Sequence, residues 1–533
     1  MSTRSPRAPW ERASLVVVLA LCAAKAFVHL ALVTRYGYHG DELYFLECGR
    51  HLAFGYVDHP PLIPWIARLA EELGGGLVTL RLPAIAAGTG TLAFTALLVR
   101  EWRGQWRAQL LALLCLLVAP AQLRTAAMLD IPVVEVFLCT LAAYLVARAL
   151  CRGERWSWII AGGVLGLATL AKHSSLLWGG ALLIGLLAGE KRGVLATRWP
   201  WLGVAVAFAL FAPNLVWQAD HGFPTLEFMR TLRHDVLAYE GRGLFLAGQL
   251  LYFHPVAAAV WMAGLVFAFT RSGREARPFA WLFLILLAFF FFAGGKPYYL
   301  ASAYPPVLAA GGVALERWLE SRITVRRTLI AALASTGLAL GFITLPILPL
   351  ARIDAIIGSL LGWAVPPMAL THDLHGMLGW EEHAAVIDRA YRSLPEHERC
   401  RAGVLAGTYS QASAVNQFRH APTPRAVSGN LTYHLWGPDG ERGDVLIAYG
   451  VPRELLERHY RSCSWLAQIA APEARPQDRD LPVYVCREPL GSMADLWPEL
   501  RQFGHGPPEP PRGEGATLAA SWDGVSPLAA DVR

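Results

Sequence analysis

Titratable side chains are concentrated in one short stretch of the sequence, between residues 36 and 62. Seven carboxylate and imidazole side chains fall within 21 residues: His39, Asp41, Glu42, Glu47, His51, Asp58 and His59. A carboxylate can remove a proton from an acceptor hydroxyl, and a nearby cation can stabilise a departing phosphate. Such a pair at a membrane surface would suit transfer from a lipid phosphate. The pattern therefore predicts a candidate catalytic loop.

The same stretch also has a purely structural interpretation. Residues 43–54 form an amphipathic pattern that suits a helix lying at the membrane surface. Asp41 and Glu42 would then stabilise the N-terminus of that helix. The prolines Pro60 and Pro61 could simply open the next helix. From the residues alone, the catalytic and structural interpretations both stay open.

Other ionisable groups lie at the ends of apolar stretches farther along the chain. Asp130 precedes one such stretch, with Glu135 inside it, Lys172-His173 separates two more, and Lys296 opens another. Ionisable groups at membrane depth are costly and are usually functional. Taken singly, Lys172 could instead be an interfacial lysine whose ammonium reaches water.

The composition identifies the elements that must position these groups. Of the 533 residues, 54% are hydrophobic and only 17% are charged, and the mean hydropathy is +0.37. An ordinary soluble protein carries roughly 25% charged residues, so soluble and disordered classes are excluded. Eleven stretches are apolar enough for a membrane span: about 15–34, 77–99, 108–124, 131–147, 157–171, 174–189, 199–218, 245–270, 279–294, 297–315 and 328–350.

The distribution of lysine and arginine predicts the orientation of these spans. With a cytoplasmic N-terminus, the cytoplasmic loops hold 19 Lys and Arg residues and the opposite loops hold eight. Cytoplasmic loops normally carry this excess. The first outer loop, 35–76, and the ionisable groups described above then share the outer face. An odd number of spans also places the chain after residue 350 outside.

Residues 351–503 have a different composition and predict a soluble domain. Strand-like runs at 403–406, 444–449 and 481–486 are separated by helical patterns at 382–394 and 453–460, which is typical of a small α/β domain. Cys463 and Cys486 could form a disulfide in an oxidising compartment. The last residues, 504–533, are rich in proline and glycine and are expected to be flexible.

Several motifs occur together in a recognisable order. They are Asp41-Glu42, Asp58-His59-Pro60-Pro61, Leu170-Ala-Lys172-His173-Ser-Ser, and Gly295-Lys296-Pro-Tyr298-Tyr299-Leu followed by Tyr304-Pro305-Pro306. On these motifs, residues 10–350 resemble the GT-C glycosyltransferases of family 39, the dolichyl-phosphate-mannose-protein mannosyltransferase-like group. That group includes bacterial lipid A aminoarabinose transferases and rhizobial galacturonosyltransferases. One departure is His59, where aminoarabinose transferases have a lysine, so a phosphate contact there would depend on protonation.

The resemblance implies a fold and an activity. The expected fold is a polytopic α-helical membrane protein of the GT-C type, with a catalytic domain at 1–350 and an extracytoplasmic α/β domain at 351–503. The expected enzyme is an inverting hexosyl- or pentosyltransferase of the bacterial inner membrane. It would take a sugar from a polyprenyl-phosphate donor at the outer face and pass it to a lipid, a glycan or a protein.

The resemblance also assigns roles to residues. The predicted catalytic residues are Asp41 as general base, Glu42 as its support or a sugar ligand, and Asp130 as a second carboxylate. The predicted substrate-binding residues are Asp58, His59, Lys172, His173, Lys296, Tyr298, Tyr299 and Tyr304. No metal ligand set is predicted, although a divalent metal is possible because some GT-C enzymes use one. No nucleic acid partner is expected.

Two other classes of function compete with this prediction. A transporter or flippase of a lipid-linked saccharide would also need charged groups at membrane depth, but transporters often show an internal repeat, and none is visible here. A sensor whose C-terminal domain binds a ligand would leave the clustering of ionisable groups unexplained. A cytoplasmic nucleotide-sugar enzyme is disfavoured because no predicted cytoplasmic loop is long enough for a nucleotide site.

Overall fold

The chain folds into two compact units, each assembled from separate stretches of sequence. The computed structural model describes residues 9–239, 241–361, 368–438, 440 and 443–504. The first unit is Met1–Thr34, His59–His221 and Arg233–Leu345; the second is Arg35–Asp58, Gly222–Leu232 and Pro346–Arg533. The first outer loop is thus divided between the units. The predicted flexible segment 504–533 lies, except for residue 504, outside the described residues.

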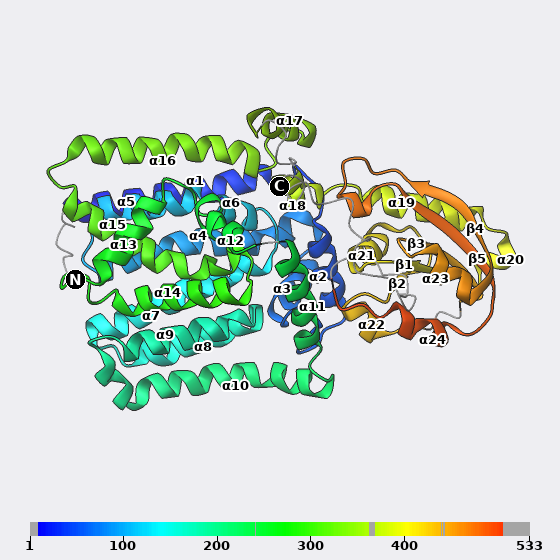
Figure 1. Cartoon of the computed structure of the whole chain (residues 1–533), viewed down its shortest axis with the longest axis horizontal. Coiled ribbons are helices and arrows are strands. Elements are labelled where there is room, and N and C mark those ends of the chain that lie inside the picture. Colours follow the sequence, from blue (N-terminus) through cyan, green and yellow to red (C-terminus); the bar gives the residue numbers. More distant parts are fainter. Residues whose placement is uncertain (1–8, 240, 362–367, 439, 441–442, 505–533) are drawn as a thin grey trace, which may run out of the picture. The chain divides into compact units, whose positions relative to one another are not determined.

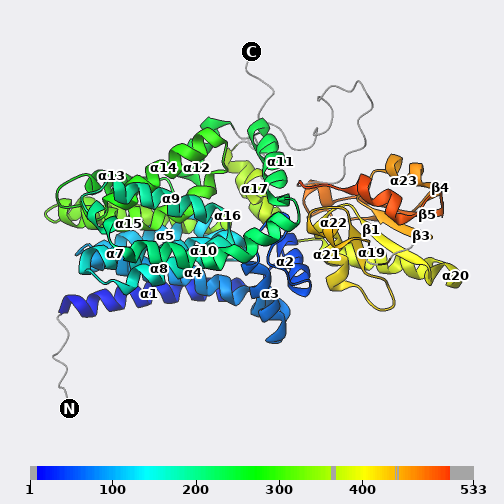
Figure 2. The ribbon, with the colours of Figure 1, turned by 90° about the horizontal axis from the view of Figure 1, so that it is seen from below.

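The first unit consists of helices, and each of the eleven predicted spans coincides with helical structure. The long helices lie side by side with their axes roughly aligned (Figures 1 and 2). They are α1 (Pro9–Leu32), α4 (Gly76–Glu101), α5 (Trp106–Val118), α7 (Ile131–Arg152), α8 (Trp156–Ala171), α9 (Ser174–Leu187), α10 (Arg198–Asp220), α13 (Ala258–Ala268), α14 (Arg277–Ala293), α15 (Tyr304–Trp318) and α16 (Ile323–Thr344). Shorter helices complete it: α3 (Leu62–Glu72), α6 (Pro120–Thr125) and α12 (Arg242–Leu251). Among the described residues, five helices are long and apolar enough to cross a membrane and five more are apolar but shorter.

Three predicted spans are interrupted, and a proline lies at each interruption. The predicted span 108–124 is split into α5 and α6 at Ala119-Pro120. The predicted span 245–270 is split into α12 and α13 around His254, whose φ is +75°, and Pro255. A proline disfavours helical backbone at the preceding residue and cannot donate a helix hydrogen bond. The span 297–315 begins with a 3₁₀ segment, Pro297–Ala303, before α15 starts with Tyr304-Pro305-Pro306. Prolines are well tolerated in the first helical turn.

Glycines allow two helix pairs of the first unit to approach closely. A Cβ atom on Gly162 of α8 would lie 2.0 Å from the carbonyl oxygen of Gly203 in α10. A Cβ atom on Gly264 of α13 would lie 2.1 Å from the carbonyl oxygen of Val307 in α15. Small residues at helix contacts are typical of membrane bundles, in which van der Waals packing drives association. These glycines therefore fit a bundle that packs within a bilayer.

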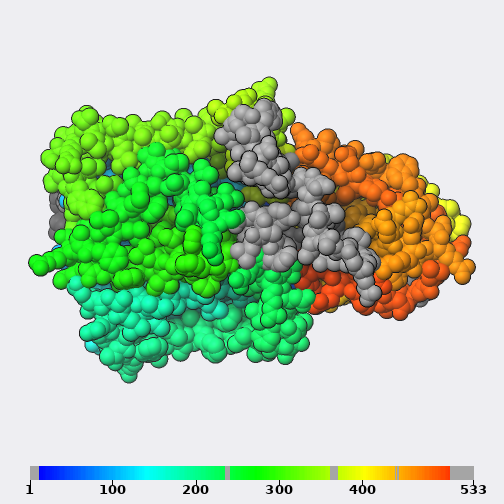
Figure 3. Space-filling view, in the orientation of Figure 1, coloured from blue at the N-terminus to red at the C-terminus, as the bar shows by residue number. Residues whose placement is uncertain are grey.

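The outermost helices of the first unit present apolar side chains. The side chains of α16 and α10 form opposite edges of this unit in the space-filling view (Figure 3). Leu338 of α16 is 67% exposed and Phe208 of α10 is 59% exposed. An aqueous protein rarely leaves large contiguous apolar surfaces bare. Lipid contact explains this surface, as the multi-pass membrane prediction requires.

The second unit contains a five-stranded mixed sheet. Its strands are β1 (Ala402–Ala406), β2 (Ala426–Ser428), β3 (Val445–Tyr449), β4 (Tyr460–Ile469) and β5 (Leu481–Pro489), in the order β2-β1-β3-β5-β4. β1 is parallel to β2 and β3, and β5 is antiparallel to β3 and β4. The predicted strands correspond to β1, β3 and β5, whereas β2 and β4 were not predicted. Cys463 and Cys486 form the predicted disulfide between β4 and β5, and Cys400 is a free, exposed thiol.

Helices cover both faces of this sheet. The helices of the second unit are α2 (Gly40–Arg50), α17 (Leu350–Leu361), α18 (Met368–His375), α19 (Trp380–Ser393), α20 (Glu396–Arg399), α21 (Tyr409–Phe418), α22 (Thr432–Trp436), α23 (Arg453–His459) and α24 (Met493–Leu496), while α11 (Pro224–Tyr239) lies in the 219–244 loop. Residues of α19 and α21 pack on one face of the sheet, and residues of α23 and α24 pack on the other. Tyr44, Cys48 and Val57 of the first outer loop belong to the first of these cores. The loop is therefore an integral part of the α/β domain.

Candidate functional site

The second unit holds Asp41 and Glu42 at the start of α2. His39 precedes the helix; its Nδ1 accepts a hydrogen bond from the backbone N–H of Asp41 at 3.1 Å. Glu42 is fully buried, and its Oε2 accepts the N–H of His39 at 2.9 Å. This reciprocal pair is a capping box, which satisfies N–H groups that an isolated helix end leaves unpaired. Glu42 thus fixes the start of the helix from which Asp41 projects.

Asp41 is partly exposed and is held by a residue of the α/β domain. Its side chain is 38% exposed. The Tyr409 hydroxyl donates a hydrogen bond to Asp41 Oδ1 at 2.6 Å, and His39 Nδ1 lies 3.5 Å from Asp41 Oδ2. Burial, and next the charge of Asp41, raise the pKa of Tyr409 well above its usual value. Tyr409 therefore remains a neutral donor throughout the physiological pH range.

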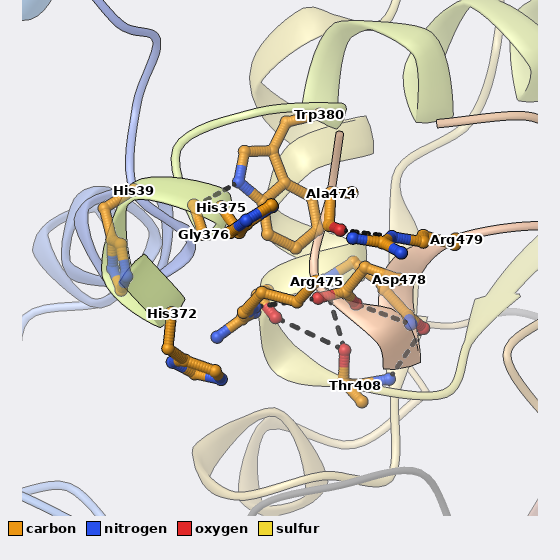
Figure 4. A network of polar contacts seen from close by, with 12 residues as sticks. His39, His372, His375, Gly376, Trp380, Thr408, Ala474, Arg475, Asp478 and Arg479 are labelled. Carbon is orange, nitrogen blue, oxygen red and sulfur yellow. Dashed lines mark hydrogen bonds and ion pairs between the residues drawn. The ribbon is translucent and has the colours of Figure 1, made fainter. Parts of the chain in front are cut away.

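A buried arginine adds positive charge beside this carboxylate. Arg475 donates from Nε to Asp478 Oδ2 at 3.0 Å, and Figure 4 shows it with Asp478 on one side and His39 on the other. Burial opposes the charge of Arg475, but Asp478, Tyr409 and Asp41 outweigh it and raise the pKa of the guanidinium. Burial lowers the pKa of His39, so its ring is neutral at pH 7. Arg475 is therefore a positively charged group that acts on Asp41.

Two further carboxylates of the loop are anchored within the second unit. The Tyr44 hydroxyl lies 3.0 Å from Asp58 Oδ1 and 2.6 Å from Thr432 Oγ1. Glu47 is buried and forms ion pairs with Arg50 and Arg425. These contacts tie the loop to the segments around α21 and α22. Asp58, a predicted substrate ligand, therefore also has a structural contact.

The first unit gathers a second set of predicted residues around Lys172. Lys172 lies between α8 and α9, and its Nζ is 3.2 Å from Glu135 Oε2 in α7. The ammonium also lies 4.6 Å from the ring centroid of Tyr299 and 5.5 Å from that of Tyr298. Ser174 donates to the other oxygen of Glu135 at 2.8 Å. Lys172, Tyr298 and Tyr299 are thus brought together in the structure.

His173, His59 and Asp130 lie close to this set. His173 Nε2 is 3.0 Å from Asn214 Oδ1. His59 is buried, and its Nδ1 is 2.9 Å from the carbonyl oxygen of Pro60. Asp130 caps α7 by accepting the N–H of Ile131 at 2.7 Å. Asp130 interacts electrostatically with Lys172, and His59 with His173.

Lys296 and Tyr304 occupy different surroundings. Lys296 is partly exposed and immediately precedes the 3₁₀ segment that carries Tyr298 and Tyr299. Tyr304 is fully buried, stacks on Phe253 with ring centroids 3.8 Å apart, and donates to Gln249 Oε1 at 3.0 Å. Tyr304 therefore packs in the interior of the bundle, and its predicted role in lining a substrate cavity stays a prediction.

Sequence analysis did not identify Tyr409 and Arg475. Neither lies in a motif, and Tyr409 is 368 residues from Asp41 along the chain. Glu135 was noted inside its span, but its ion pair with Lys172 was not foreseen. Within the residues that the structure describes, no three His, Cys, Asp or Glu side chains are grouped so that they could hold a metal ion.

The fold and the two charged clusters define a class of protein: a polytopic helical membrane protein of the GT-C fold with a small α/β domain. Residues 58–217 match the family model described as dolichyl-phosphate-mannose-protein mannosyltransferase. This match confirms the resemblance to the mannosyltransferase-like GT-C group that the motifs indicated.

Solved structures extend the similarity to almost the whole chain. The crystal structure of ArnT from Cupriavidus metallidurans bound to undecaprenyl phosphate aligns with a TM-score of 0.58 and 16% identity. The apo structure of the same protein aligns with a TM-score of 0.56 and 18% identity. Each alignment covers 88% of this chain and 97% of ArnT. Comparison of the sequence with curated proteins found no match. The GT-C fold is confirmed.

Proposed function

We propose that the protein is an inverting glycosyltransferase that uses a polyprenyl-phosphate-linked sugar donor. The observation that carries this proposal is the fold similarity to ArnT, a protein crystallised with undecaprenyl phosphate. The alignment covers 88% of this chain. The matched family model, dolichyl-phosphate-mannose-protein mannosyltransferase, also describes the use of a lipid-phosphate sugar. The cluster around Lys172 and the carboxylate of Asp41 each provide chemistry suited to such a reaction.

The cluster around Lys172 suits the phosphate of the donor. A lysine ammonium carries three protons and can bind phosphate as a point charge while it keeps one carboxylate partner. Glu135 holds the ammonium in place, and the faces of Tyr298 and Tyr299 complete its surroundings. A positive group at this position would stabilise the charge that develops on the leaving lipid phosphate. His59, His173 and Lys296 are the further candidates for this end of the donor.

Asp41 suits the acceptor. In the proposed single displacement, Asp41 removes the proton of the acceptor hydroxyl as its oxygen bonds to the anomeric carbon. The bond from that carbon to the phosphate oxygen breaks, and the lipid phosphate leaves with the electron pair. The acceptor attacks from the face opposite the phosphate, so the anomeric configuration inverts. Asp130 is proposed as a second carboxylate at the donor end, because it interacts electrostatically with Lys172.

The proposal includes a cellular location. We place the protein in the bacterial inner membrane with its N-terminus in the cytoplasm and the α/β domain outside. The excess of lysine and arginine in alternate loops supports this orientation. The sugar is a hexose or a pentose, and the acceptor is a membrane lipid, a glycan or a protein.

Turnover of a labelled donor tests the proposal. The full-length protein, reconstituted in liposomes, is given undecaprenyl phosphate carrying a radiolabelled hexose or pentose, and the loss of intact donor is measured with water or membrane extract as acceptor. We expect Asp41→Asn to lower turnover at least 100-fold, because removal of a general base typically costs 10²–10⁴-fold. Glu381→Gln, at an exposed carboxylate of α19, is the matched control and should turn over normally.

Two other results would count against the proposal. Normal turnover by Asp41→Asn would remove Asp41 from the mechanism. Donor that crosses the liposome membrane intact, without hydrolysis or transfer, would replace the transferase with a flippase of lipid-linked saccharides.

A further inference from the structure

The α/β domain supplies the side chains that surround the proposed base. Asp41 lies on α2, whereas Tyr409 begins α21 directly after strand β1. Both belong to the second unit, and α2 packs against α21. The hydroxyl of Tyr409 reaches Asp41 Oδ1 at 2.6 Å, a typical length for a hydrogen bond to a charged oxygen.

The position of Tyr409 is itself tightly fixed. Thr408 and Gln411 form a capping box at the start of α21, and the N–H of Tyr409 donates to Asn430 Oδ1 at 3.1 Å. The Tyr409 ring packs against Tyr44 with ring centroids 4.7 Å apart. A phenol held in this way directs its O–H group to one position, where Asp41 Oδ1 accepts the hydrogen bond. The contact therefore restricts the rotamer of the Asp41 carboxylate.

Polar and charged groups from several segments of the second unit face Asp41. From its own segment, neutral His39 approaches Oδ2. From α21, Tyr409 donates a hydrogen bond, and from the segment after β4, Arg475 brings a positive charge. Two further carboxylates interact electrostatically with these neighbours of Asp41: Asp373 with His39, and Asp58 with Tyr409. Hydrogen bonding to the charged form of a carboxylate favours that form.

We propose that Tyr409 is a positioning residue, which orients the carboxylate of Asp41 and keeps it ionised for proton removal. The α/β domain is then part of the catalytic unit, with Tyr409 as its contribution. This inference rests on the proposed function, in which Asp41 is the general base.

The test is the Tyr409→Phe variant of the full-length protein in the donor-turnover assay. The variant keeps the ring and its packing on Tyr44 but removes the hydroxyl that donates the hydrogen bond to Asp41. We expect kcat to fall about tenfold, the factor that corresponds to one hydrogen bond to a charged group. The KM for the donor should stay unchanged, because the Lys172 cluster is untouched.

A pH profile separates positioning from a general loss of structure. Without the hydrogen bond, the carboxylate loses stabilisation, the pKa of Asp41 rises, and the base is protonated at a higher pH. The acidic limb of the kcat profile should therefore move upward by roughly one pH unit. Tyr460→Phe is the matched control: it removes a buried hydroxyl that donates to the carbonyl oxygen of Gly443 at 3.0 Å, in the same domain. We expect this control to keep both the rate and the profile of the wild type.

The outcomes distinguish this inference from the proposed function. Suppose that Asp41→Asn is inactive, while Tyr409→Phe keeps the wild-type rate and the wild-type acidic limb. This result would overturn the role of Tyr409 alone. Equal losses in Tyr409→Phe and Tyr460→Phe, with no shift of the limb, would overturn it too, because domain stability would explain both. A normally active Asp41→Asn variant would instead overturn the proposed function. Thermal unfolding of each variant confirms that folded protein is compared.

Discussion

Lys172 shows how a single residue combines a structural and a chemical role. Its ammonium is paired with buried Glu135, and both charges lie in a helical unit with an apolar exterior. Removing one partner of a buried pair leaves an uncompensated charge and costs about 3–5 kcal/mol. A single substitution would therefore confuse loss of phosphate binding with loss of stability.

A double substitution separates the two roles. Lys172→Met alone should lower both stability and turnover, whereas Lys172→Met with Glu135→Gln should recover most of the thermal stability. We expect the double variant still to bind the donor at least tenfold more weakly, because the positive charge at the phosphate is gone. The measurements are thermal unfolding and the KM for the labelled donor. A wild-type KM in the double variant would show that the pair serves the fold alone.

At the scale of elements, the start of α2 decides where Asp41 points. His39 and Glu42 form the reciprocal cap, and the helix then continues into the core beneath the sheet. The amphipathic stretch 43–54, predicted as a helix at the membrane surface, largely coincides with the capped helix α2, which packs on α21. The cap and the packing of α2 on α21 together fix the position of the Asp41 backbone.

Two substitutions at Glu42 distinguish the cap from a catalytic role. Glutamine can replace glutamate in a capping box, so Glu42→Gln should keep thermal stability and more than half of the turnover. Glu42→Ala removes the acceptor of the His39 N–H and should cost about 1–2 kcal/mol of stability, with a parallel loss of turnover. Both are measured by thermal unfolding and by the donor assay. A stable but inactive Glu42→Gln would instead assign the charge of Glu42 to the chemistry.

At the scale of the whole molecule, the chain alternates between its two units. It enters the second unit after Thr34, returns at His59, and enters it again after His221 and after Leu345. The domain after residue 346 is therefore built together with segments from two earlier loops. These loops and the domain must lie on the same side of the membrane, which ties the predicted orientation to the fold.

Reporter fusions test this common side. An alkaline phosphatase fused after residue 360 should be active, because we place this segment outside the cytoplasm, where the enzyme forms its disulfides. A fusion within the 271–278 loop should be inactive. Green fluorescent protein at the same two positions should give the opposite pattern. A cytoplasmic signal at residue 360 would show that the predicted orientation in the membrane is inverted. The proposed site would then lie on the cytoplasmic face, which contradicts the proposal.

The class of protein and most of its elements could be predicted from the sequence alone. Low charge, long apolar runs and the lysine and arginine bias are local properties, and each predicted span became helix. The strands β1, β3 and β5 were visible because they are short buried apolar runs. β4 was missed because its residues Tyr460–Ile469 are half-exposed and polar, with only its ends buried. β2 has only three residues, too few for a periodic signal.

The contacts between polar groups, in contrast, follow from the way in which separate elements pack. The sequence indicated Asp41 and Lys172, but Asp41 is held by Tyr409 and lies beside Arg475, and Lys172 is paired with Glu135. No spacing rule links Asp41 to a tyrosine 368 residues away, because their contact depends on the packing of α2 against α21. Hydrophobic patterns specify which faces are buried, whereas the partners of a polar group depend on how separate elements pack together.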